Sequence, residues 1–148
     1  MTKKIFNSPL SVCTGRKNFI LNLNQYRNAH YRVTNNAKRK YKEFMEEQIN
    51  SYTRSKGKCM FVYTIYKGDN RIFDIGNICS IHQKFFEDAL VELGKLGDDK
   101  FSVVPMVVYC FGGIDKKNPR VEIELVDDAK GFKSRASRKL ERILERLY

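Results

Sequence analysis

The chain of 148 residues has no long apolar run and no closely spaced cysteines. No segment approaches the roughly 18 consecutive apolar residues that a membrane helix needs, and no apolar signal-peptide core follows the polar residues 1–4. We therefore expect a cytoplasmic protein with no membrane partner. Its four cysteines lack a Cys-x-x-Cys pair, which argues against structural zinc and, without a secretory signal, against disulfides. We expect them to be small buried hydrophobic residues.

Acidic residues are also scarce. The chain has 17 Asp and Glu against 28 Lys and Arg, a net charge of +11. Residues 1–58 hold 13 basic and 3 acidic residues, whereas residues 59–148 hold 15 and 14. A polyanion is thus expected to bind through the N-terminal part. An anionic membrane surface would use the same charge, but no matching lipid-binding helix is evident.

The few acids that are present cluster. Seven of the 17 fall between Asp69 and Asp99, around one expected helix. They are Asp69, Asp74, Glu87, Asp88, Glu92, Asp98 and Asp99. A basic protein repels metal ions, so a local concentration of carboxylates indicates that something uses the negative charge. A divalent metal is the obvious user and nucleic acid the obvious polyanion, which predicts a metal-dependent nuclease.

Length and composition predict one folded domain over residues 1–148, since 42% of the residues are hydrophobic and 12% aromatic. We expect strands over 18–24, 58–66, 101–111 and 120–126, and helices over 34–52, 74–97 and 134–148. Residues 25–36 read as a loop, and 112–119 as a hairpin joining the last two strands. Pro105 suggests an edge strand or a bulge. The predicted fold is α+β, a mixed sheet of about four strands with two to three helices.

The helix over 74–97 is expected to carry a polar stripe. At about 100° per residue, Asn77, Ser80 and Asp88 lie within roughly 40° of Lys84, and the apolar residues centre more than about 100° away. Asp74 enters the stripe at one end, and Asp98 and Asp99 follow the helix. Two or three carboxylates can hold magnesium for phosphodiester hydrolysis, and a lysine can contact the phosphate or stabilise the leaving oxygen.

The same residues have a structural interpretation. Asp74 or Asn77 would cap the helix, and Lys84 with Asp88 would be an ordinary pair one turn apart. Asp98 and Asp99 follow Gly97 and would be turn residues. Spacing alone leaves both interpretations open.

The motifs resemble those of the RusA family of Holliday junction resolvases. Asp74-Ile75-Gly76-Asn77, Lys84 to Leu90 and Asp98-Asp99 follow the family core, which reads Asp-x-Asp-Asn, then Lys-x-x-x-Asp-Ala-Leu, then Asp-Asp. The intervals from Lys84 to Asp88 and from Asp88 to Asp98 are kept. Upstream, Asn24-Gln25-Tyr26-Arg27 and His30 are similar to the N-terminal Asn-x-Tyr-Arg motif. The similarity runs from about residue 22 to 125.

The resemblance implies a homodimer that nicks four-way DNA junctions symmetrically with Mg²⁺ or Mn²⁺ and no small-molecule cofactor, in recombination and repair. It implies that Asp74 and Asp99 are metal ligands and that Lys84 is catalytic. Asn77 and Asp88 match motif positions with less defined roles, and Asp88 and Asp98 complete the expected metal set. The family is typically borne by phages or prophages, so a bacterial cytoplasm is the expected setting.

Three departures from the family pattern stand out. The second Asp of the family is Gly76 here, so Asp88, Asp98 or Asp69 would have to replace that ligand. The interval from Asn77 to Lys84 is four residues longer, about one helical turn. Leu21 and Asn22 stand where the family has paired prolines.

Basic residues are expected to bind the DNA backbone. They are Arg27, His30, Arg32, Lys38, Arg39, Lys40 and Lys42. The helix over 134–148 is basic and amphipathic, and it would bind DNA, pack on its own domain or pack across a dimer. Alternative functions are a broader flap or branch nuclease, and a non-catalytic DNA-binding protein that lost metal affinity through Gly76.

Overall fold

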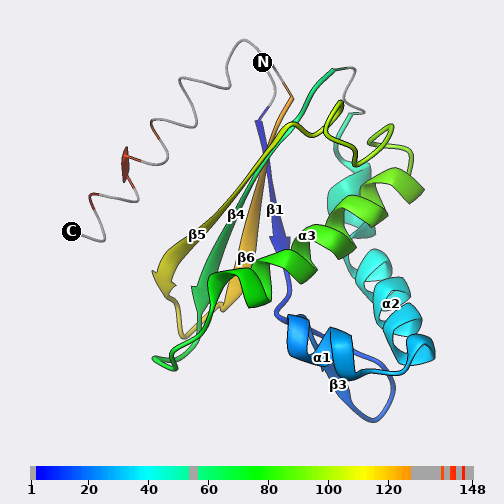
Figure 1. Cartoon of the computed structure of the whole chain (residues 1–148), viewed down its shortest axis with the longest axis vertical. Coiled ribbons are helices and arrows are strands. Elements are labelled where there is room, and N and C mark those ends of the chain that lie inside the picture. The colour runs from blue at the N-terminus through cyan, green and yellow to red at the C-terminus, as the bar shows by residue number, and fades with distance from the viewer. Residues whose placement is uncertain (1–2, 54–56, 128–137, 139–140, 143–144, 146–148) are drawn as a thin grey trace.

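A computed structural model of the chain describes residues 3–53 and 57–127, with positions 138, 141, 142 and 145 (Figure 1). The helix expected over 134–148 therefore lies outside the described residues, apart from those four positions. The strands are β1 (Lys3–Ser8), β2 (Ser11–Cys13), β3 (Asn18–Ile20), β4 (Met60–Lys67), β5 (Met106–Ile114) and β6 (Arg120–Val126). The helices are α1 (Leu23–Asn28), α2 (Tyr31–Asn50) and α3 (Ile75–Glu92).

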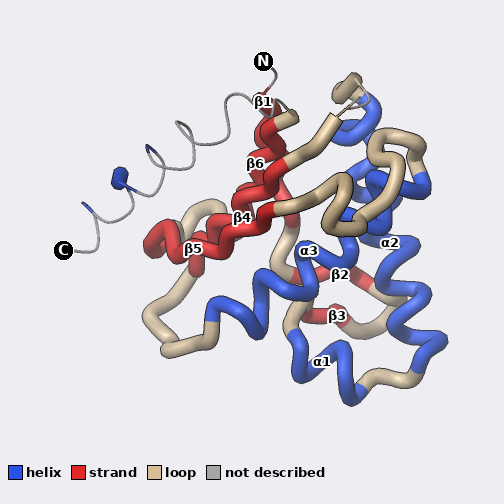
Figure 2. The backbone as a smooth tube through the Cα atoms, turned by 45° about the horizontal axis from the view of Figure 1, so that its top comes forward, coloured by secondary structure: helices blue, strands red, loops and turns tan. Residues whose placement is uncertain are grey.

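The described residues form one small α+β domain, as predicted. A four-stranded mixed sheet has the order β1-β6-β4-β5, and β2 and β3 form a separate two-stranded sheet. β4 and β5 are parallel, while β6 is antiparallel to both β4 and β1. α3 crosses one face of the large sheet, and α2 packs beside it (Figures 1 and 2). No helix in the described segments is long and apolar enough to cross a membrane.

α3 is the central element of the core. Phe86 faces the sheet, where its ring packs against Phe6 of β1 and Phe61 of β4. Phe85 points away from the sheet, toward Phe19 of β3 and Tyr41 of α2. With both sides of α3 buried in this way, only a narrow stripe of the helix is left facing solvent.

The prediction of a hairpin between the last two strands is wrong. β5 and β6 do not pair, because β4 lies between them. Gly112 and Gly113 do not begin a turn but form an irregularity that lets β5 continue to Ile114. Gly113 has φ +127°, and a Cβ on Gly112 would approach the Tyr66 ring to 2.7 Å. The two glycines therefore form a β-bulge, where Gly113 supplies the positive φ and Gly112 leaves room for the Tyr66 ring. Pro105 directly precedes β5, which is an edge strand as expected.

The N-terminal part also differs from expectation. The sequence prediction had no element at β1, and the expected strand over 18–24 ends at Ile20. The Asn22 side chain accepts a hydrogen bond from the Gln25 backbone N–H at 2.7 Å and so caps α1. α1 and the first turns of α2 thus occupy most of the region that was expected to be a loop. Three of the four cysteines are buried as expected, whereas Cys13 is exposed.

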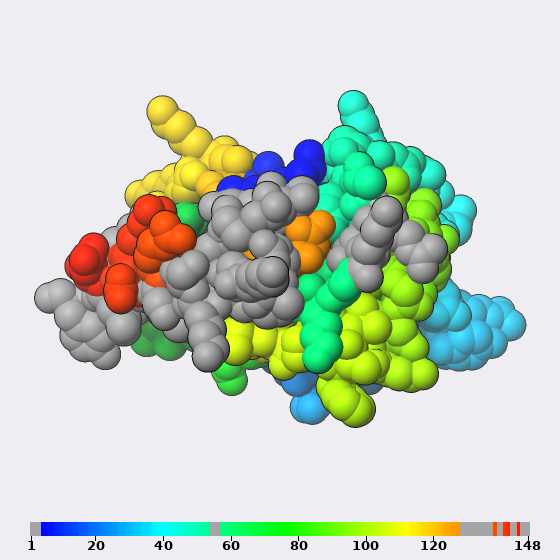
Figure 3. Space-filling model, turned by 90° about the horizontal axis from the view of Figure 1, so that it is seen from above, coloured from blue at the N-terminus to red at the C-terminus, as the bar shows by residue number. Residues whose placement is uncertain are grey.

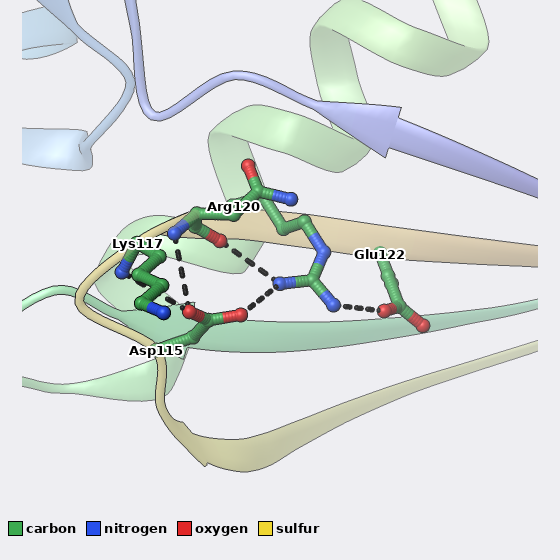
Figure 4. A network of polar contacts seen from close by, with 5 residues as sticks. Asp115, Lys117, Arg120 and Glu122 are labelled. Atoms are coloured by element: carbon green, nitrogen blue, oxygen red, sulfur yellow. Dashed lines mark hydrogen bonds and ion pairs between the residues drawn. The ribbon is translucent and has the colours of Figure 1, made fainter.

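The connection from β5 to β6 is closed by a polar network (Figure 4). Asp115 accepts hydrogen bonds from the backbone N–H groups of Lys117 and Asn118. Arg120 donates to Asp115 at 2.9 Å and to Glu122 at 2.5 Å, and its guanidinium lies 4.3 Å from the centroid of the Tyr66 ring. These contacts fix the turn after β5 and have a structural role.

Candidate functional site

The exposed stripe of α3 carries Lys84, as predicted. The Lys84 side chain is exposed and makes no ion pair within the described segments, while Asn77, Ser80 and Asp88 along the same stripe are partly buried. The neighbouring positions 85 and 86 are buried in the core on either side. Core packing on both flanks therefore fixes the direction in which Lys84 points.

Asp74 and Asn77 take up the structural roles that the sequence left open. Asp74 is the N-cap of α3, and its Oδ1 accepts a hydrogen bond from the Gly76 N–H at 2.9 Å. The Asn77 Oδ1 accepts a hydrogen bond from the Leu23 N–H at 3.0 Å, which joins the start of α1 to the start of α3. Asp74 is exposed and so stays accessible to a ligand, but its present contact is a cap.

The predicted carboxylates separate into two groups. Asp74 and Asp88 are 14 positions apart on one helix, which places them about 20 Å apart along its axis. Asp99 lies near the other end, because its charge and that of Asp88 both raise the pKa of Glu87. Asp88 and Asp99 thus both act on Glu87, and Lys84 lies one helical turn before Asp88, whereas Asp74 lies at the other end of α3.

Asp98 is engaged in a local turn. Its Oδ1 accepts a hydrogen bond from the Asp99 N–H at 2.8 Å, and its Oδ2 lies 2.9 Å from the Lys100 ammonium. The contact with Lys100 lowers the pKa of the Asp98 carboxyl. The loop that holds Asp98 and Asp99 lies beside α2 in the space-filling view (Figure 3, yellow-green beside cyan).

Glu87 is the residue that sequence reasoning missed. Only 4% of it is exposed, although its neighbours Lys84 and Asp88 face the stripe. The Tyr63 hydroxyl donates to Glu87 Oε1 at 3.2 Å, and the Gln83 amide donates to Oε2 at 3.4 Å. Tyr109 in turn hydrogen-bonds to Gln83. Glu87 thus lies between α3 and the two parallel strands, a position that depends on tertiary packing.

Burial raises the pKa of the Glu87 carboxyl to about 7. The hydrogen bonds from Gln83 and Tyr63 oppose this rise, whereas the charges of Asp99 and Asp88 add to it. A carboxyl with such a pKa can hold or release a proton near neutral pH, a property common at reaction sites. The sequence gives no signal for it, because Tyr63 and Tyr109 are far from Glu87 along the chain.

The carboxylates of one chain do not form a ready-made metal site. Across residues 3–53 and 57–127, no group of three or more His, Cys, Asp or Glu side chains could hold a metal ion. Gly76 leaves room for the carboxylate of the family pattern, since a Cβ there would meet only Asp74 Oδ1 within 4 Å, at 3.4 Å. Asp69 is occupied locally by the backbone and guanidinium of Arg71. The four-carboxylate metal set stays a prediction.

The basic run over 38–42 is largely neutralised by carboxylates. Lys38 pairs with Asp88 at 3.5 Å and Lys42 with Glu92 at 2.7 Å, so two ion pairs join α2 to α3. Arg39 and Lys40 both pair with Glu43 within α2.

Arg27, His30 and Arg32 differ from this run. All three are exposed at the bend between α1 and α2, and the described residues offer them no ion-pair partner. The unneutralised positive charge of this region therefore lies at the bend.

Two other features, a buried polar cluster and a surface cavity, are weaker candidates for a functional site. Ser8 Oγ lies 2.6 Å from both the Tyr41 hydroxyl and His82 Nδ1, but all three residues are fully buried. A surface cavity of about 330 Å³ lies beside the loop before α3 and is lined largely by apolar side chains such as Phe73 and Phe111. It has few convergent polar groups, so it is a weaker candidate than the α3 stripe.

Comparison with known proteins adds no family assignment. No protein-family model matches the chain, and no curated protein matches it.

Proposed function

We propose that this protein is a RusA-like endonuclease that nicks branched DNA, with four-way junctions as its substrate. The observation that carries the proposal is the group on the C-terminal half of α3. There Lys84, which is exposed and has no ion-pair partner among the described residues, stands one helical turn before Asp88, and the charges of Asp88 and Asp99 act on the buried Glu87. Lys84, Asp88 and Asp99 of this group match the family motif in type and spacing.

The side chains of this group have chemically distinct roles. The Lys84 ammonium donates to a phosphate oxygen of the scissile strand and neutralises charge that develops on the leaving oxygen. Glu87 holds a proton near neutral pH at its Oε atoms. Asp88 and Asp99 are the pair that would hold Mg²⁺ or Mn²⁺, which supplies charge neutralisation when bound and commonly takes only one or two protein carboxylates.

A homodimer is part of the proposal. Asp74 and Asp88 are too far apart along α3 to act on one phosphate within a chain. A two-fold dimer would let the two ends of α3 come from different chains, and it would match the pseudo-two-fold symmetry of a four-way junction. The proposed setting is a bacterial cytoplasm, in recombination and repair.

The test is a cleavage assay on a four-way junction, with and without Mg²⁺. We expect Asp99→Asn and Lys84→Ala to reduce nicking at least about a hundredfold, a loss typical of removing an electrostatic contact in a reaction centre, while junction binding is retained. Glu47→Gln is the control, because Glu47 is an exposed acid of α2 that is not a member of the group. Native-level cleavage by Asp99→Asn or Lys84→Ala would remove that residue from the site.

Asp74→Asn tests the other end of α3. Asn caps a helix about as well as Asp, so a loss of cleavage would report on the carboxylate and not on folding. We expect cleavage to be lost. Mixing the Asp74→Asn and Asp99→Asn chains should then restore part of the activity if the two ends act across a dimer, because one mixed site would be intact.

A non-catalytic branched-DNA-binding protein is the second candidate, favoured by Gly76 and by the separation of the carboxylates. The Gly76→Asp variant tests it, since the backbone there has room for a side chain. Nicking by Gly76→Asp but not by the native chain would establish that the native chain binds without cutting. Equal cleavage of junction, flap and linear duplex would instead indicate a broader nuclease.

A further inference from the structure

An exposed aromatic ring is held in place at the bend between α1 and α2, and this bend lies at the lower right of Figure 1. Tyr31, the first residue of α2, is 62% exposed. The His30 ring lies against it, with centroids 4.5 Å apart and planes tilted by 36°. The Arg32 Nε donates to the Tyr31 hydroxyl at 3.3 Å, and its guanidinium lies 5.9 Å from the ring centroid.

The backbone of α2 fixes this arrangement. His30 is the N-cap of α2, and its Nδ1 accepts a hydrogen bond from the Arg32 N–H at 3.2 Å. The imidazole is thus held by the first turn of a 20-residue helix, and the imidazole and Arg32 hold the tyrosine. A large ring that is already ordered loses little conformational entropy when it contacts a ligand.

The charge around the ring favours a polyanion. No acidic residue lies in the first turn of α2, and Arg27 lies in the last turn of α1. Within the described part of the chain neither Arg27 nor Arg32 has a carboxylate partner, in contrast to the neutralised run over 38–42.

The bend is tied to α3. Asn77 holds the start of α1, and the Tyr26 ring packs against Phe85 at 6.3 Å between centroids. These two contacts place α1, and with it the bend, at a fixed position relative to the helix that carries Lys84.

We propose that Tyr31 stacks on an unpaired base of branched DNA, while Arg27 and Arg32 contact the flanking phosphates. The inference rests on the proposed DNA-binding function and names the feature of the substrate that this surface recognises. Stacking on an aromatic side chain is available to any base that has left the helical stack, and it tolerates any sequence. Bases of an intact duplex are already stacked on each other, so Tyr31 favours a branch over a linear duplex.

The test compares two probes of equal length and ionic strength, a duplex with a central two-base bulge containing 2-aminopurine and the same duplex fully paired. Tyr31→Ala should weaken binding to the bulged probe between about fivefold and a hundredfold, and it should leave affinity for the paired probe unchanged within about twofold. Tyr31→Phe should retain the native affinities, because the ring is kept. Binding of the native chain should quench 2-aminopurine fluorescence through the stacked ring, and Tyr31→Ala should abolish that quenching.

Phe44→Ala is the matched control, because Phe44 is an aromatic residue of the same helix with 59% exposure. Equal weakening on both probes by Tyr31→Ala, or unchanged quenching, would overturn the inference. Binding of neither probe by the native chain would overturn the proposed function as well. Binding with the expected preference but without nicking of a junction would remove the nuclease proposal and support the stacking role of Tyr31 by itself.

Discussion

At the residue scale, Glu87 shows how one buried side chain changes the chemistry of an acidic cluster. Lys84, Asp88 and Asp99 remain in solvent or partly exposed, whereas Glu87 is enclosed between α3 and the sheet. The carboxyls of the cluster therefore differ in burial, and burial raises the pKa of the Glu87 carboxyl to about 7. This difference gives the site a feature that can be measured without any substrate.

Glu87 should make the chain less stable as the pH rises through neutrality. Its pKa is about 7 in the folded chain against an ordinary value of 4.5, so its contribution to stability is present at low pH and lost as the pH rises through about 7. Glu87→Gln keeps an acceptor for Tyr63 and removes this titration. The difference in free energy of unfolding, variant minus native chain, should therefore increase by about 2–3 kcal/mol between pH 5 and pH 8.

Urea unfolding at pH 5, 6, 7 and 8 measures this difference. His82 acts in the opposite sense, because burial lowers its pKa from 6.5 to about 3. Its contribution is present above about pH 6.5 and is lost as the pH falls toward 3. Since both chains contain His82, the comparison isolates Glu87, and parallel pH profiles for the two chains would disprove the assignment.

At the scale of elements, α1 depends on a side chain from α3. Asn77→Ala removes the acceptor of the Leu23 N–H and should lower the local stability of α1 by about 1 kcal/mol. Hydrogen exchange at Leu23 and its neighbours should accelerate, while the amides of β4 keep their protection. Asn24→Ala is the control, because Asn24 is exposed on α1 itself. Unchanged exchange at Leu23 would show that the contact does not hold the helix.

The sequence predicted the positions of the long helices and strands better than it predicted which strands pair with each other. α2, α3, β4 and β6 were located because their apolar periodicity matches the faces that they bury. The pairing of β5 failed for a different reason: alternation in a strand does not say which edge it will occupy, and Gly112 and Gly113 fit a turn as well as a bulge. α1 was missed because a six-residue helix has too short a periodic pattern and depends on its Asn22 cap and on Asn77.

The candidate site was predicted in part. The direction of Lys84 follows from helical periodicity, and the structure bears it out. Periodicity also places Asp74 and Asp88 on neighbouring sides of one helix, but it gives only their angle around the helix axis and not their separation along it. Likewise, the charges of the run over 38–42 are evident in the sequence, whereas their partners Asp88 and Glu92 come from another helix.

At the scale of the whole molecule, net charge overstates the charge available to DNA. The basic side chains of the run over 38–42 already have carboxylate partners. Replacing one of them should therefore reduce the number of counterions released on DNA binding by less than replacing a basic side chain without such a partner. Arg27→Ala should reduce the slope of log affinity against log salt by about 1, and Lys42→Ala should change it less. Fluorescence anisotropy with a junction between about 50 and 200 mM salt measures both slopes. Equal changes would mean that the Lys42–Glu92 pair opens on DNA.

The pairing of β1 with β6 has a consequence for how the protein is made. β1 spans residues 3–8 and is synthesised long before β6, which spans residues 120–126 and is its only strand partner in the large sheet among the described residues. While the chain emerges from the ribosome, β1 has no edge to join until nearly all described residues have been translated. The sheet therefore closes late, after a slow search over a long sequence separation. A ribosome-bound chain that has already exposed its basic bend would still lack the finished sheet behind Glu87.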